Sequence, residues 1–342
     1  MLKSAMPRYL DDDQRQELQR RRDTFGWRSE WPTWMVIAAI YGGWFGVALN
    51  ARTLGLVPSV ALLAVLSCWY MSLQHELIHA HPTRWPLVNM LFGLAPLAVW
   101  FPYEVYRESH LRHHDDAHLT DPARDPESYY VTPAQWANAG PVLRAALAAR
   151  NTFAGRMLIG PWFSIAASWR EAAQAVAEGR WRIVASWAVH LALLALLAGW
   201  LESRCGIPWR AFVFGVGYAS LALASVRSFQ EHRAAERESE RTVVNEAAWP
   251  WRLLFLNNNY HAVHHDLPGV PWFALGGIYA RRRDAYRASN GGFIVRGYGE
   301  WARRHAFAQG AGPVHPFAAP VAGADAGRNE AARGRDTARL AS

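Results

Sequence analysis

Four long stretches of this chain are apolar and carry no charged side chain. They comprise residues 33–49, 54–73, 183–201 and 211–226. An α-helix rises 1.5 Å per residue, so about 20 apolar residues cross the roughly 30 Å hydrocarbon core of a bilayer. The pattern therefore predicts an all-α polytopic membrane protein with four transmembrane helices.

A fifth uncharged segment, residues 85–103, is also long enough to cross. It contains Pro86, Pro96 and Pro102. Proline inside a helix removes a backbone hydrogen bond and clashes with the preceding turn. We therefore expect this segment to be re-entrant or interfacial, and not a further crossing.

Lysine and arginine positions predict the orientation of the helices. Seven lie in residues 1–33, nine in residues 107–182 and sixteen from residue 227 onward. Because cytoplasmic segments are enriched in these residues, we expect the long polar segments and both termini to be cytoplasmic. The net charge of +8 then reflects topology and contact with anionic headgroups. No nucleic-acid-reading motif accompanies it, so we expect no nucleic-acid partner.

Composition suggests three parts. Residues 1–32 form a polar N-terminal segment, and residues 33–307 contain all the apolar stretches. Residues 308–342 are rich in alanine, glycine and arginine without apolar periodicity, which predicts a disordered tail. Cys68 and Cys205 are isolated, which argues against a disulfide framework or an iron–sulfur module in this chain.

Nine of the fourteen histidines lie in short motifs beside the predicted membrane segments. Histidines four residues apart share one face of a helix, whereas adjacent histidines point about 100° apart and naturally serve different ions. Nine imidazoles exceed the coordination number of one ion, and two ions with four or five ligands each would use them all. Imidazole with little thiolate favours iron or zinc. The candidate ligands are His75 and His79 in HELIH, His110, His113 and His114 in HLRHH, His232 in QEHR, and His261, His264 and His265 in HAVHH.

Polar residues beside these motifs are candidates for orienting the ligands. Ligating histidines commonly donate their second N–H group to a carboxylate or carbonyl oxygen. An aspartate follows each HxxHH motif, three asparagines precede HAVHH, and a glutamate precedes the histidine of QEHR. The orienting residues predicted on this basis are Asp115, Asp266, Asn257, Asn258 and Glu231. Nearby Asp121, Asp125 and Glu127 are expected to be orienting or solvated groups.

Five other histidines lie outside the motif pattern, and two of them, His305 and His315, belong to the polar tail region and are expected to have no role. We expect His81 and His118 to be pocket or interface residues, because they lie close to the motifs in sequence. His190 lies within the third apolar stretch, where a polar side chain is costly and usually faces another helix. We expect it to hydrogen-bond a neighbouring helix.

Together these motifs resemble the three histidine boxes of the membrane-bound fatty acid desaturase and hydroxylase superfamily. The boxes are HELIHAHP, HLRHHDDAH and LNNNYHAVHHDLPGVPW, in that order, and VRSFQEHR resembles the extra ligand position after the last span. The resemblance covers roughly residues 33–300. The HxxxH form of the first box is similar to that of acyl-lipid desaturases, and the chain looks closest to their bacterial members.

The resemblance implies a cytoplasmic helical cap in which the nine histidines hold two iron ions, with O2 as cosubstrate. It implies an oxygen-dependent desaturase that introduces a double bond into a fatty acyl chain, as an integral protein of the bacterial inner membrane. Residues 33–307 would form the desaturase domain. Electrons would come from an external ferredoxin, rubredoxin or cytochrome b5-type donor with its reductase.

Other readings of the same residues remain open. A hydroxylase or ketolase of the superfamily, acting on acyl lipid, alkane or carotenoid, would share every ligand; SFQEH lacks the Asn-Tyr feature usual in alkane hydroxylases. HELIH also fits the HExxH motif of zinc proteases, with Glu76 as general base, but this leaves both HxxHH motifs unexplained. A non-catalytic metal carrier is a further alternative. The acyl carrier, chain length and position attacked are not encoded in these motifs.

Overall fold

The computed structural model describes residues 9–114 and 116–318. Within them, four apolar helices are long enough to span a membrane: Trp31–Leu49, Leu56–Ile78, Trp181–Cys205 and Ala211–Ser228. They comprise α3 (Trp31–Leu49), α5 (Leu56–Ile78), α12 (Trp181–Trp200) continued by the π-helix η3 (Leu201–Cys205), and the π-helix η4 (Ala211–Val216) continued by α13 (Gly217–Ser228). The predicted all-α polytopic fold with four spans is confirmed.

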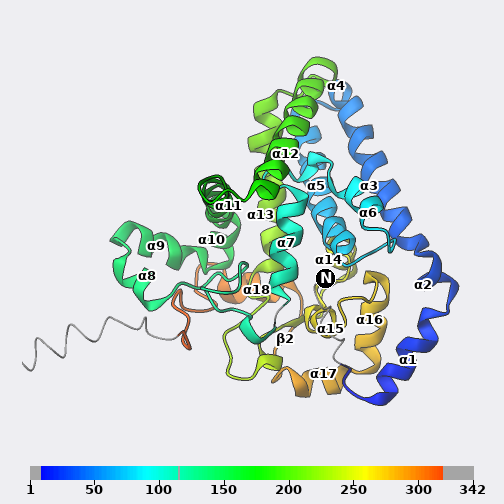
Figure 1. Ribbon diagram of the computed structural model, residues 1–342, viewed down its shortest axis with the longest axis vertical. Coiled ribbons are helices and arrows are strands. Elements are labelled where there is room, and N and C mark those ends of the chain that lie inside the picture. Colours follow the sequence, from blue (N-terminus) through cyan, green and yellow to red (C-terminus); the bar gives the residue numbers. More distant parts are fainter. Residues whose placement is uncertain (1–8, 115, 319–342) are drawn as a thin grey trace, which may run out of the picture.

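The spans form two antiparallel hairpins, and their outer ends lie near α4 (Ala51–Leu54) and η3 in Figure 1. Trp44 of α3 is fully buried, and its indole N–H donates to the Ser67 hydroxyl of α5 at 3.1 Å. Apolar side chains such as Met35 and Leu196 are exposed on the outside of the spans. An exposed apolar surface on a long helix suits contact with lipid and not with water.

The segment expected to be re-entrant or interfacial forms two short helices, α6 (Pro86–Gly93) and η1 (Pro96–Ala98). The buried Tyr70 hydroxyl of α5 lies within hydrogen-bonding distance of three carbonyl oxygens here, 2.6 Å from that of Gly93. Neither helix is long enough to cross a bilayer. The segment therefore does not form one continuous membrane-spanning helix.

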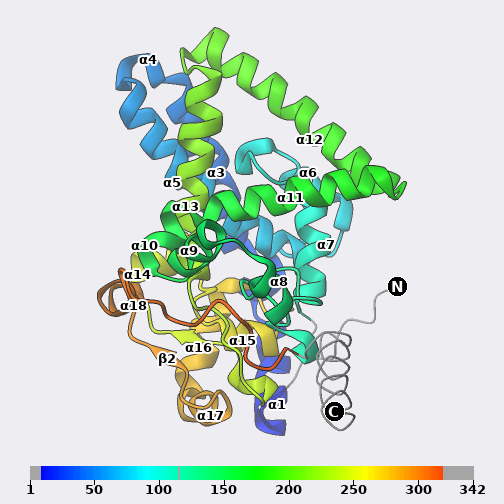
Figure 2. The same cartoon turned by 90° about the vertical axis from the view of Figure 1, so that its left-hand side faces the viewer.

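The remaining elements form a helical cap at the inner ends of the spans (Figures 1 and 2). Its two strands, β1 (Val244–Asn245) and β2 (Ile294–Val295), pair in parallel. The other cap elements are α1 (Asp12–Arg22), α2 (Phe25–Ser29), α7 (Tyr103–His113), η2 (Asp116–His118), α8 (Pro133–Asn138), α9 (Pro141–Arg150), α10 (Phe153–Leu158), α11 (Gly160–Ala177), η5 (Glu238–Glu240), α14 (Trp249–Leu254), α15 (His261–Asp266), α16 (Trp272–Arg281), α17 (Arg283–Ser289) and α18 (Tyr298–His305).

The first part of the predicted disordered tail packs against the cap. The backbone N–H of His315 donates to the Val131 carbonyl oxygen, and Val131 donates to the carbonyl oxygen of Pro313. The buried His315 ring also lies 3.0 Å from the Thr120 hydroxyl. Residues 308–318 are therefore an ordered strap, contrary to the expectation from composition, because backbone pairing compensates for their few apolar contacts. The rest of the predicted tail, residues 319–342, lies outside the described residues.

Candidate metal centre

The nine motif histidines converge at the inner ends of the spans and divide into two groups. In each group, one nitrogen per histidine lies within 4.8 Å of every other. The five-histidine group consists of His75, His79, His110, His114 and His264, and the four-histidine group consists of His113, His232, His261 and His265. The adjacent His113 and His114 belong to different groups, as do His264 and His265.

Each of the three histidine boxes lies in or at the end of a helix, which orients its histidine side chains. The first lies at the end of α5, the second at the end of α7, and the third forms the short helix α15. Backbone hydrogen bonds hold α15 in place: the Ala262 N–H donates to Val243 at 2.9 Å, and the Asn245 N–H donates to Asn259 at 2.8 Å. His232 lies beyond the last span, where it forms an antiparallel bridge with Thr242.

Distances between ring nitrogens test whether a metal ion fits. In the five-histidine group the His79 and His110 Nε2 atoms are 3.1 Å apart, and in the other group the His113 and His232 Nε2 atoms are 3.0 Å apart. With metal–nitrogen bonds of about 2.1 Å, ligands at right angles lie about 3.0 Å apart and tetrahedral ligands about 3.4 Å apart. The spacing is therefore close to that of nitrogen atoms that share one metal ion.

The Nδ1 atoms of several ligand candidates contact oxygen atoms on the outside of the cluster. His110 Nδ1 lies 3.0 Å from a Glu127 oxygen, and His113 Nδ1 lies 2.8 Å from an Asp125 oxygen. A carboxylate only accepts hydrogen bonds, so it holds the single hydrogen of a neutral imidazole on Nδ1 and leaves the Nε2 lone pair free. Lone pairs at about 3 Å repel one another unless a cation lies among them, so the donor set fits bound metal.

The protonation of the isolated cluster also favours cation binding. Burial is the main cause that lowers the pKa of His79, His110, His114, His232, His261 and His264. Most of these imidazoles are consequently neutral near pH 7. His113 is different: burial lowers its pKa, but the charge of Glu127 and the hydrogen bond that His113 donates to Asp125 outweigh this and raise the pKa to about 9. A metal ion at this position would displace one proton.

The predicted orienting residues have different environments. Asn258 contacts both groups: its Oδ1 lies 2.9 Å from His261 Nδ1, and its Nδ2 lies 3.4 Å from His75 Nε2. Glu231 lies 3.3 Å from His261 Nδ1 and accepts from Arg227 at 2.6 Å.

The other three orienting predictions fare differently. Asn257 makes no hydrogen bond to a motif histidine of the described residues. Its side chain donates to the Trp272 carbonyl oxygen and accepts from the Arg252 guanidinium group. Asp266 is the last residue of α15, directly after the ligand candidate His265. Asp115 lies outside the described residues.

The remaining histidines and Glu76 lie outside the two groups. The His81 imidazole hydrogen-bonds the Glu30 carboxylate in the protein interior, and His118 lies beside Arg124. His190 donates to the Val99 carbonyl oxygen at 2.8 Å. The Glu76 carboxylate accepts the Trp272 backbone N–H at 3.0 Å and lies 3.5 Å from His75 Nδ1. The Glu76 carboxylate thus lies beside Nδ1 of the ligand candidate His75.

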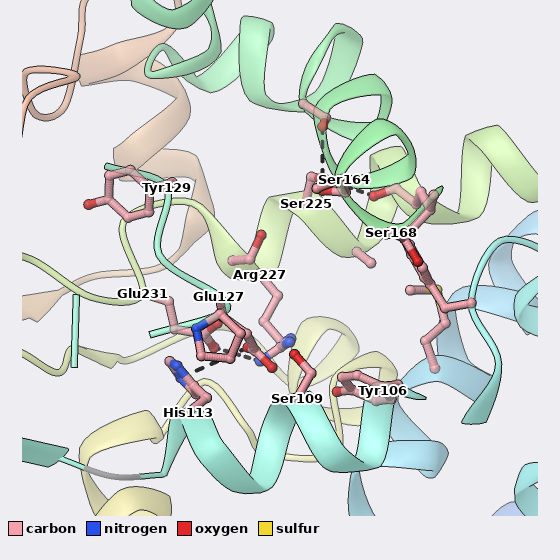
Figure 3. A pocket seen from close by; sticks show the side chains of 18 of the residues that line it. Tyr106, Ser109, His113, Glu127, Tyr129, Ser164, Ser168, Ser225, Arg227 and Glu231 are labelled. Atoms are coloured by element: carbon pink, nitrogen blue, oxygen red, sulfur yellow. Dashed lines mark hydrogen bonds and ion pairs between the residues drawn. The ribbon is translucent and has the colours of Figure 1, made fainter. Parts of the chain in front are cut away.

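A cavity of about 400 Å³ borders the cluster, and His75, His113 and His232 form part of its wall. Apolar residues from the spans and the re-entrant segment line it, including Met71, Phe101 and Leu221. Figure 3 shows His113, Glu127, Glu231 and Arg227 close together on one side, with Ser164, Ser168 and Ser225 across the cavity on α11 and α13. A substrate in this cavity would lie against the metal centre.

The family comparison agrees with this geometry. Residues 51–297 match the fatty acid desaturase family, which is more than half of the chain. The chain belongs to the fatty acid desaturase family. No curated protein matches this desaturase-family chain closely enough to serve as a named relative. The family membership and the two histidine groups together identify an oxidoreductase with a metal-binding site at the membrane.

Three residues of this desaturase-family protein beside the cluster were not singled out from the sequence. Arg227 pairs with Glu231, and the Tyr129 hydroxyl donates to the His232 carbonyl oxygen at 2.6 Å. Arg156 stacks over the Tyr129 ring at 4.6 Å. Only Arg227 lies next to a motif, SFQEH, that could have drawn attention to it in the sequence. Tyr129 and Arg156 are brought to the cluster by tertiary packing.

Proposed function

We propose that this protein is an oxygen-dependent di-iron desaturase that introduces a double bond into a fatty acyl chain at the membrane. The observation that carries the proposal is the division of nine histidines into groups of five and four beside one cavity, in a chain of this family. Two iron ions, when bound, would supply the oxygen activation needed to attack an unactivated C–H bond. The nine histidines are the proposed ligands.

The roles of the protein's own residues follow from their contacts. Asp125 and Glu127 hold hydrogens on Nδ1 of His113 and His110, and Asn258 orients His261. The cavity encloses the reacting part of the substrate, which limits access of water. Two hydrogens would leave the acyl chain and, with two electrons from a donor and two protons, reduce O2 to two molecules of water.

Electron supply and orientation are part of the proposal. No cysteine cluster is present in the sequence, so an external ferredoxin, rubredoxin or cytochrome b5-type protein would deliver the electrons. We place the cap and both termini in the cytoplasm, on the basis of the positive residues in these segments. Glu178→Cys and Arg303→Cys should then react with a thiol reagent from the cytoplasmic side, and Ser203→Cys from the other side.

The test is expression in a bacterial host with a compatible donor, followed by mass spectrometry of its lipids. A product lacking two hydrogens supports desaturation, and His264→Ala should abolish it. A product that has instead gained an oxygen atom would overturn desaturation in favour of the hydroxylase or ketolase of the same family. His118→Ala is the matched control, because His118 lies outside both histidine groups.

A further inference from the structure

Two arginines on the cavity wall have no carboxylate partner. Arg150 ends α9 and Arg156 lies in α10, and both line the cavity that borders the histidine cluster. No carboxylate of the described residues lies within 4.0 Å of either guanidinium group. Both arginines therefore differ from Arg227 in the same wall, whose guanidinium group pairs with Glu231 at 2.6 Å.

The acidic residues of this cavity are already engaged elsewhere. Glu127 contacts His110 at 3.0 Å, and Asp125 contacts His113 at 2.8 Å. Glu171 lies 3.8 Å from Arg112 and 3.7 Å from Arg180. Arg150 and Arg156 thus have no carboxylate of this wall in direct contact, and bound metal ions would add positive charge beside them.

Packing holds the two guanidinium groups in place. Arg150 lies over the Phe163 ring at 4.9 Å and donates to the Tyr129 carbonyl oxygen, and Arg156 lies over the Tyr129 ring at 4.6 Å. The Nε atoms of both arginines and Nη2 of Arg156 are covered from solvent and make no hydrogen bond to a described residue. Covering a cation without a counter-charge is costly, and a bound anion would offset that cost.

We propose that Arg150 and Arg156 bind the anionic group of an amphiphilic substrate, either a carboxylate or a phosphate. Planar guanidinium groups recognise both anions through paired hydrogen bonds. Tyr129 connects this site to the metal centre, because its ring supports Arg156 and its hydroxyl donates to the His232 carbonyl oxygen. The apolar part of the substrate would lie along Met71, Phe101 and Leu221 of the same cavity.

This inference rests on the proposed function and adds to it a substrate class. A substrate held here carries its charge inside the cavity, and its anionic end fixes which carbon lies beside the histidines. The site would select a charged acyl compound over an uncharged lipid of the same chain length.

The test measures binding of three probes with one chain length: decanoate, decyl phosphate and decanol. The full-length purified protein is used without reductant, so that no turnover occurs, and tryptophan fluorescence reports the dissociation constants. At least one anionic probe should bind tenfold or more tightly than decanol, because hydrogen bonds between ionised groups are stronger than those of a neutral hydroxyl group. Tighter decanoate binding assigns a carboxylate, and tighter decyl phosphate binding assigns a phosphate.

Variants then locate the site. Arg150→Gln and Arg156→Gln should each weaken binding of the preferred anion about tenfold and leave decanol binding unchanged. Arg144→Gln is the matched control: Arg144 is also an α9 arginine stacked on an aromatic ring, 5.6 Å from Trp136, but it does not line the cavity. Arg156→Lys, which keeps the charge, should retain more affinity than Arg156→Gln.

Wild-type protein that binds decanol as tightly as both anions would overturn the proposal, whatever the folding of the variants. Equal weakening by Arg144→Gln would overturn it as well. Failure of the proposed function has a different signature: anion binding would persist while the lipid profile showed no desaturated product. The two proposals can therefore fail separately.

Discussion

Asp125 and His113 form a buried pair in which a carboxylate oxygen lies 2.8 Å from Nδ1 of the imidazole. The same carboxylate accepts the backbone N–H groups of Thr120 and Glu127 at 2.8 and 2.9 Å. Asp125 therefore shapes its own loop and at the same time orients a ligand candidate of the four-histidine group.

Replacing this carboxylate should weaken metal binding more than folding. Asp125→Asn retains the size of the side chain but loses the charge, and loss of such an outer partner typically costs 10–100-fold in metal affinity. Iron titration of the purified variant should show this loss. Asp121→Asn is the control, because Asp121 lies in the same loop and its carboxylate accepts the Ala123 N–H at 2.8 Å. Equal affinities in both variants would contradict the role of Asp125.

The two histidine groups predict a stoichiometry of two metal ions per chain. His264→Ala removes a member of the five-histidine group and His261→Ala a member of the four-histidine group. Each should lower bound iron from about two to about one per chain and abolish activity, because both ions are needed together. Elemental analysis of the folded proteins measures this. A single tightly bound zinc in the wild type would contradict it.

Neighbouring asparagines should behave differently on substitution. Asn258 contacts His261 and His75, so Asn258→Ala should reduce iron occupancy and activity. Asn257 donates to the Trp272 carbonyl oxygen at 2.9 Å, so Asn257→Ala should lower the free energy of unfolding by about 1–3 kcal/mol. The folded variant should lose little iron. Melting temperature and iron content, measured together, distinguish the two outcomes.

The His81–Glu30 pair predicts a pH dependence of stability. Burial lowers the pKa of His81, but the hydrogen bond and charge of Glu30 outweigh this and raise it above 6.5. A histidine whose pKa is raised by folding stabilises the folded state fully at pH values below its pKa in the unfolded chain. This contribution is lost as the pH rises through its pKa in the folded protein. The stability difference between wild type and His81→Gln should thus shrink from pH 6 to alkaline pH. Glu30→Gln should remove the same dependence; a difference that grows with pH would contradict the pair.

The spans and the nine histidines could be predicted because their signals are local. A long uncharged apolar stretch indicates a membrane span, and a repeated HxxHH motif indicates metal binding, even when the fold is unknown. The assignment of each histidine to a group could not be predicted in full. Adjacent residues such as His113 and His114 point apart on any helix, but the partners that they meet depend on how α7 packs.

Long-range support of the centre was harder to foresee. Asp125 lies twelve residues after His113, and its orienting role depends on the loop folding back on α7. Arg150 and Arg156 reach the cavity only because α10 packs against α13 of the last span and α9 packs against α10, and their sequence context resembles that of any polar helix. Composition was misleading for residues 308–318, since it does not report backbone pairing with Val131.

The ordered strap predicts two different truncation results. Ending the chain after residue 318 should leave activity unchanged. Ending it after residue 307 removes His315, whose ring contacts Thr120, and should lower the melting temperature and iron retention. His315→Ala in the full chain should produce part of the same effect. Full activity and stability of the shorter form would contradict a structural role for the strap.

Thr120 connects this strap to the metal centre. Its hydroxyl lies beside His315, its backbone N–H donates to Asp125, and Asp125 in turn contacts His113. A ribosome adds the strap after all four spans have been synthesised, so the loop that orients His113 is clamped from both sides only at that late stage. The loop that orients His113 thus depends on a segment that follows all four spans in the chain.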